Sequence, residues 1–188
     1  PDLTYSFYPV WCSLFGIKYK NYPVGDDFRI NPEDYKEKNG GVVIPNPNAP
    51  TSLGEGLDFV EKILDYNQDS VVIIDEAYVD FGGTSSVPLI EKYENLLVTG
   101  TFSKSRSLAG LRIGFAIGSK ALIDVMEAVK NSYNSYTVDS LSIEMGAASI
   151  EDDEYFKSTC KKVIKTRERV TLELEKLGFD VLDSQTNF

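Results

Sequence analysis

The sequence contains no histidine, and this absence removes several kinds of catalysis at once. A Ser-His-Asp triad, a Cys-His pair, a histidine general base and a histidine-ligated metal site all require an imidazole ring. The two cysteines, Cys12 and Cys160, lie far apart and lack the spacing of metal ligands. We therefore expect two free thiols and no metal site. Catalysis, if present, relies on Lys, Tyr, Asp or Glu side chains or on a cofactor.

Positive charge is also scarce. The 188 residues include 19 Lys and Arg against 29 Asp and Glu, which gives a formal net charge of -10. Nucleic acids and anionic membranes are bound through basic surfaces, so this composition argues against both as partners. No apolar run approaches the ~20 residues of a membrane helix, and no secretory signal pattern opens the chain. These features predict a cytoplasmic protein, and the abrupt ends at Pro1 and Phe188 suggest a piece of a longer one.

Short apolar runs alternate with amphipathic stretches along the chain. The runs at residues 42–44, 71–74, 96–98 and 113–117 are continuous rather than alternating, as in parallel strands that are covered on both faces. Helical spacing of apolar residues occurs at about 10–15, 57–64, 120–130 and 152–177. This alternation predicts an α/β fold, a three-layer αβα arrangement around a mostly parallel sheet. Gly178 is expected to end the last helix, and residues 179–182 to begin a further strand.

Polar side chains follow three of the predicted strands. Asn48 comes after the first run, Asp75 and Tyr78 after the second, and Ser103 and Lys104 after the third. In open α/β sheets, ligands bind beyond the carboxyl ends of the strands. The sequence therefore predicts a ligand site at this edge of the sheet.

Lys104 gains interest from its neighbours. A lysine after a strand is usually a solvated loop residue, but Ser103 precedes this one and Arg112 follows in the same loop. A hydroxyl and a guanidinium are good phosphate ligands, and a lysine beside a bound phosphate can capture an aldehyde on the same ligand. Arg106 is also close, but we expect its charge to face solvent.

Asp75 also has two interpretations. In isolation it would be taken as a helix cap or an ion-pair partner. Beside a ligand, its carboxylate would keep a pyridine nitrogen protonated, so that the ring withdraws electrons. Tyr78 could donate to a ring oxygen, and the prolines around Asn48 would aim its amide, although a half-buried tyrosine and a simple turn are the ordinary alternatives. Tyr5 or Tyr8, at the head of the first helical stretch, could stack on a planar ring.

Five motifs carry a family resemblance that covers nearly the whole chain. They are Thr4-Tyr5-Ser6, Pro47-Asn48-Ala49-Pro50-Thr51, the segment 75–81 (DEAYVDF), Thr101-Phe102-Ser103-Lys104 and Leu108-Ala109-Gly110-Leu111-Arg112. Together they resemble the fold type I pyridoxal-phosphate (PLP) dependent aminotransferases, and most closely the histidinol-phosphate aminotransferases of histidine biosynthesis. The resemblance implies the large-domain fold of aspartate aminotransferase, with PLP as the cofactor.

The resemblance also implies a role for each predicted site residue. Lys104 would form the Schiff base with PLP and then act as the general acid and base. Asp75 would pair with the pyridinium nitrogen, Tyr78 and Asn48 would bond the ring O3′, and Tyr5 would stack on the ring. The phosphate would be held by two further residues, Ser103 and Arg112.

For the chain as a whole, the resemblance implies amino transfer between an amino donor and a 2-oxo acid acceptor in a homodimer. Residues 1–177 would be the PLP-binding large domain and residues 178–188 the start of a small domain. Because parts of such a site lie outside these residues, we expect the chain alone to be inactive. Ser52 departs from the family, which usually has glycine after Pro-Thr.

Three alternatives remain open at this stage. A PLP-dependent amino-acid-phosphate decarboxylase would use the same electron sink, and so would an aminotransferase for aromatic or other amino acids. A non-enzymatic module with a cofactor fold is the third alternative.

Overall fold

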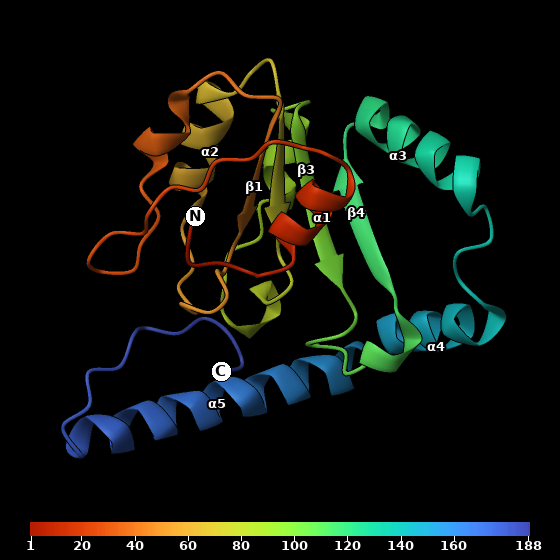
Figure 1. The fold of residues 1–188 in the computed structure, drawn as a ribbon. Coiled ribbons are helices and arrows are strands. Elements are labelled where there is room, and N and C mark those ends of the chain that lie inside the picture. The colour runs from red at the N-terminus through yellow and green to blue at the C-terminus, as the bar shows by residue number, and fades with distance from the viewer.

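The computed structural model describes all 188 residues, and a four-stranded sheet forms its centre (Figure 1). The strands are β1 (Gly41–Pro45), β2 (Val71–Asp75), β3 (Leu96–Thr101) and β4 (Gly114–Gly118), in the order β1-β2-β3-β4. Strands β1, β2 and β3 are parallel, and β4 is antiparallel to β3. The expected mostly parallel sheet is therefore confirmed.

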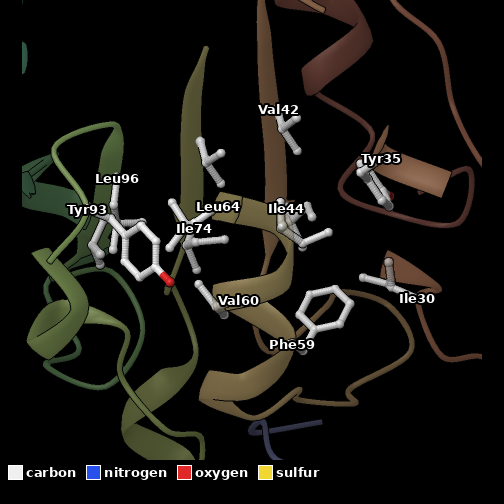
Figure 2. Close-up of a cluster of buried hydrophobic side chains, with 13 residues drawn as sticks. Ile30, Tyr35, Val42, Ile44, Phe59, Val60, Leu64, Ile74, Tyr93 and Leu96 are labelled. Carbon is white, nitrogen blue, oxygen red and sulfur yellow. The ribbon is translucent and has the colours of Figure 1, made fainter. Parts of the chain in front are cut away.

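One face of the sheet is covered by helix α2 (Leu57–Tyr66). Its apolar side chains, including Phe59, Val60 and Leu64, pack against Ile44 of β1 and Ile74 of β2 (Figure 2). The apolar side of the amphipathic helix α2 thus packs against every second residue of strands that are apolar along their length. This contact forms the main hydrophobic core.

On the opposite face lie α1 (Tyr8–Leu14) and the start of α3 (Lys120–Tyr133), so that helices flank both faces of the sheet in the expected three layers (Figure 1). The side chains of Leu97 and of Leu122 in α3 both approach Gly118 on β4. Helix α1 contacts the sheet through Tyr8, which reaches the end of β2. Both contacts lie on the face away from α2.

Strand β4 differs from the expectation of a parallel strand buried on both faces. Its side chains Phe115 and Ile117 are 46% and 39% exposed. The connection from β3 contains only the short 3₁₀ helix Ala109–Leu111. A parallel return requires a longer crossover, usually a helix, so this connection reverses the chain direction.

Two helices follow below the carboxyl ends of the parallel strands, α4 (Ser140–Glu151) and α5 (Asp153–Lys176) (Figure 1). The long helix α5 was expected, whereas α4 was not. The strand expected at residues 179–182 is absent, because no partner strand lies beside this segment. The chain instead returns to the sheet edge, where the Gln185 N–H donates to the Ser52 carbonyl at 2.8 Å.

Short 3₁₀ helices complete the fold at Pro32–Lys36, Val79–Phe81 and Val87–Glu91. No helix in the structure combines the length and the apolar composition needed to cross a membrane.

Candidate active site

The parallel register places the predicted polar residues at one edge of the sheet. Asp75, the last residue of β2, is paired with Pro45 on β1 and with Thr99 on β3. The loops that follow these three strands therefore start side by side. This edge is where the topology of an open α/β sheet places a ligand.

The Asp75 carboxylate is held by two donors from the chain. Tyr8 donates its hydroxyl hydrogen to Oδ2 at 2.7 Å, and the Ala77 backbone N–H donates to Oδ1 at 3.2 Å. A carboxylate has about four lone-pair positions, so two remain for a ligand. Burial raises the pKa of Tyr8, and the neighbouring Asp75 raises it further, so this phenol stays a neutral donor.

Lys104 lies over the ring of Tyr78, with Nζ 5.1 Å from the ring centroid. Its side chain is exposed, and no carboxylate lies within ion-pair distance of it. The same tyrosine ring meets Phe188 edge-on at 5.1 Å, so the C-terminal residues reach this site. A lysine amine without an ion-pair partner is available for reaction with a carbonyl compound.

The loop that carries Lys104 is fixed by the two residues that follow this lysine. The Ser105 hydroxyl donates to the Asp80 carboxylate, and Arg106 donates to the Ser149 carbonyl in α4. The Arg106 guanidinium also stacks on Phe156 of α5, at 4.0 Å from the ring centroid. The expectation that Arg106 faces solvent is therefore wrong, because α4 and α5 close over its side chain.

Asn48 is buried, with 1% of its surface exposed. Its amide donates both hydrogens within the chain, to the Leu3 carbonyl at 2.9 Å and to the Thr51 hydroxyl at 3.0 Å. Its carbonyl oxygen accepts from Thr4 at 3.2 Å. A bond from this amide to a ligand oxygen would require one of these contacts to break, so the structure gives Asn48 a loop-fixing role.

The two predicted phosphate ligands lie in the segment from the end of β3 to the start of β4. The Ser103 backbone N–H donates to the Thr101 hydroxyl at 3.1 Å, and the Ser103 hydroxyl itself makes no hydrogen bond within the chain. Arg112 is exposed, has a φ of 54°, and donates to the Ala109 carbonyl at 2.8 Å. The Arg112 guanidinium has no acidic residue within ion-pair distance.

Tyr5 lies beside this edge in an aromatic group. Its ring is 47% exposed and meets the ring of Tyr8 at 5.4 Å and that of Trp11 at 6.4 Å. The bond from Tyr8 to Asp75 was not predicted from the sequence. The only hint of this bond in the sequence was the pair Tyr5 and Tyr8, three residues apart, just before and at the start of α1.

Comparison with known proteins identifies the family of the chain. The model of the family described as aminotransferase class I and II matches residues 1–188. Histidinol-phosphate aminotransferase 2 of Dechloromonas aromatica is 55% identical over the whole chain and 53% of its own length. The chain spans about half the length of the curated relatives it matches.

Solved structures show the same fold. A putative histidinol-phosphate aminotransferase from Erwinia carotovora atroseptica matches 99% of this chain and 56% of its own, with a TM-score of 0.89 and 25% identity. The histidinol-phosphate aminotransferase of Sinorhizobium meliloti, solved in complex with pyridoxal-5'-phosphate, matches 97% of this chain and 51% of its own. Its TM-score is 0.85 and its identity 21%, which supports likeness of fold.

Proposed function

The chain belongs to the class I and II aminotransferase family, and from this premise we propose that it forms the PLP-binding half of a histidinol-phosphate aminotransferase. The observation that carries the proposal is Lys104 at the end of β3, without an ion-pair partner, beside the ring of Tyr78. A carboxylate with free lone pairs, Asp75, ends the neighbouring strand.

The residue types at this edge match the chemical groups of PLP. An aldehyde requires an amine, which Lys104 supplies, and a cationic ring nitrogen requires a carboxylate, which Asp75 supplies. Ser103 and Arg112 offer a hydroxyl and a guanidinium for the phosphate. Tyr5 offers an exposed ring for stacking.

When bound, PLP supplies an electron sink that stabilises negative charge at the substrate Cα. The chain contributes binding, orientation and proton transfer. Asp75 would hold the proton on the pyridine nitrogen, and the Lys104 amine would take the proton from the substrate Cα and return it. Tyr78 would donate to the phenolic O3′ attached to the ring. Asn48 already donates both amide hydrogens, to the Leu3 carbonyl and to the Thr51 hydroxyl. Its proposed bond to O3′ of PLP is therefore the weakest of these assignments.

The names of the relatives support histidinol phosphate as the amino donor substrate. We propose 2-oxoglutarate as the acceptor in this direction, as the family resemblance implies. We propose further that the full-length protein containing this chain is a homodimer in the cytoplasm, as the family resemblance implies.

The test is a turnover assay on that full-length protein, loaded with PLP. Histidinol phosphate and 2-oxoglutarate should be consumed together, with glutamate as a product and no carbon dioxide release. Lys104→Ala should lower the rate by about 10⁴-fold or more, because it removes both the amine and the proton carrier. Lys120→Ala, an exposed lysine paired with Asp124 outside the site, is the matched control. Histidinol phosphate has no carboxylate to lose, so the decarboxylase alternative is tested with an amino-acid phosphate as substrate. Carbon dioxide release from it without any need for 2-oxoglutarate, together with no turnover of histidinol phosphate, would instead establish a decarboxylase.

A further inference from the structure

Tyr8 connects the first helix to the candidate active site. Its hydroxyl lies 2.7 Å from Asp75 Oδ2 across 67 residues of sequence, and it makes the only hydrogen bond from α1 to the sheet. A hydroxyl that donates to a carboxylate at this distance forms a charge-assisted bond, which is stronger than a bond between neutral groups. The contact is thus a substantial constraint on the orientation of Asp75.

Helix α1 has little else to fix it in place. It has seven residues, and none of them is buried. Its apolar side chains Val10, Trp11 and Leu14 are 48%, 46% and 74% exposed. Packing within this chain therefore contributes little to the position of α1. Apart from the bonds of Leu3 and Thr4 to Asn48 upstream of the helix, the bond from Tyr8 is its main polar anchor.

The same side chain also supports Tyr5. The two rings meet edge-on, with centroids 5.4 Å apart and an angle of 83° between their planes. One residue therefore contacts both the carboxylate assigned to the ring nitrogen of PLP and the aromatic ring assigned to its face. Tyr8 keeps its proton at neutral pH, since burial and the adjacent carboxylate both raise its pKa.

We propose that Tyr8 is a positioning residue, which orients the Asp75 carboxylate toward the ring nitrogen of PLP and holds Tyr5 beside the ring. The inference rests on the proposed function, because it assigns the ring nitrogen to Asp75. Tyr8 acts through Asp75 and needs no contact of its own with the cofactor.

The experiment uses the full-length protein and the variant Tyr8→Phe, which keeps the ring and removes only the donor. A hydrogen bond to a charged group contributes enough that its loss should weaken PLP binding by about 10- to 100-fold. The kcat should fall while the KM for the amino donor changes less than about threefold, because in this proposal Tyr8 acts through Asp75 and not on the substrate. Tyr66→Phe is the matched control, because Tyr66 donates to Glu33 at 2.6 Å outside the site.

A double-mutant cycle separates positioning from a merely structural role. In an Asp75→Asn background, Tyr8→Phe should have little further effect on PLP affinity, because its partner is already altered. Equal effects of Tyr8→Phe in both backgrounds would overturn the proposal. So would wild-type affinity and wild-type kcat in the single variant.

Two further readouts keep the proposal testable. If Tyr8→Phe does not fold, 3-fluorotyrosine at position 8 keeps the ring and the hydroxyl but makes it a stronger donor. The visible absorption band of the bound cofactor should then shift, and an unchanged band would contradict the proposal. Failure of the proposed function is distinct: wild-type protein would then retain no PLP on Lys104 after borohydride reduction.

Discussion

At the scale of single residues, Ser52 shows how the backbone constrains the loop after β1. Its φ of 65° lies in the left-handed region. A residue with a Cβ loses about 1 kcal/mol of conformational free energy there, whereas glycine does not. The serine is buried, with 7% of its surface exposed, and occupies the position where the family usually has glycine. Ser52 therefore differs from the family at a position whose backbone conformation favours glycine.

We therefore expect Ser52→Gly to stabilise the protein by about 1 kcal/mol. The measurement is the urea unfolding midpoint of the cofactor-free protein. Gly178→Ala is the reciprocal control, since Gly178 has a φ of 86° and a Cβ there would meet no atom within 4 Å. That variant should lose a similar free energy. A destabilised Ser52→Gly would show that the serine side chain itself stabilises the loop.

Glu76 makes stability depend on pH. It is 6% exposed, and it accepts hydrogen bonds from the Ser85 hydroxyl and the Ser86 backbone N–H. Burial raises its pKa above the ordinary value of 4.5, even though these hydrogen bonds lower it. The folded protein therefore holds this proton more tightly than the unfolded chain does.

The stabilisation from protonated Glu76 is complete below pH 4.5 and is lost as the pH rises through the higher pKa of the folded state. In Glu76→Gln this loss should disappear, so the free energy of unfolding of wild type relative to the variant should fall as the pH rises. Denaturant unfolding between about pH 4 and 7 measures the difference. The exposed Glu94→Gln is the control, and a wild-type slope in Glu76→Gln would refute this account.

The placement of Asp75 and Lys104 at one edge of the sheet was predictable, because the loops after neighbouring parallel strands start at the same edge. The bond from Tyr8 to Asp75 was not, because nothing in the sequence fixes where a short helix with no buried side chain will dock. The roles of Asn48 and Arg106 depend on which partners reach them. Those partners, Leu3 and Ser149, are distant in sequence.

At the scale of elements, the loop after β3 is stabilised by helices that follow much later. Arg106 donates to Ser149 in α4, and it stacks on Phe156 in α5 and on Phe102 in the loop itself, at 4.0 and 5.6 Å from the ring centroids. A cation over two rings with a hydrogen bond to a carbonyl stabilises by about 2 kcal/mol. The position of Lys104 therefore depends on α4 and α5.

Arg106→Ala should lower the free energy of unfolding by about 2 kcal/mol, while Arg106→Lys should recover only part of it, since an ammonium lacks the planar stacking surface. Urea unfolding of the cofactor-free protein measures the change. Arg169→Ala, an exposed arginine on α5, is the control. Equal stabilities for Arg106→Ala and Arg169→Ala would show that the stack contributes nothing.

The positions of β1, β2 and β3 followed from their continuous apolar runs, and that of the long helix α5 from the helical spacing of its apolar residues. The direction of β4 did not, since apolar content alone does not distinguish parallel from antiparallel strands. Helix α4 was also missed. Most of its apolar residues are exposed, among them Leu141, Ile143 and Met145, so it lacks the amphipathic pattern of a helix that covers a core.

At the scale of the whole molecule, the candidate site is open. Lys104 and Arg112 are exposed, and Tyr5 is 47% exposed. Catalysis on a charged intermediate benefits from the exclusion of water, and this edge of the sheet does not exclude it.

We therefore expect the 188-residue chain by itself to turn over histidinol phosphate at least about 10²-fold more slowly than the full-length protein, if at all. The comparison uses equal concentrations of both proteins, each saturated with PLP and assayed for glutamate formation. Comparable rates would contradict the proposal that the remaining half of the protein completes the site.

The central claim is that Lys104 carries PLP. Its most direct test is to incubate the full-length protein with PLP, reduce it with borohydride, digest it and map the modified peptide by mass spectrometry. The account predicts one dominant modified lysine, Lys104, and no stable modification in Lys104→Ala. Modification spread over exposed lysines such as Lys120 and Lys157, with Lys104 no more reactive than these, would contradict it.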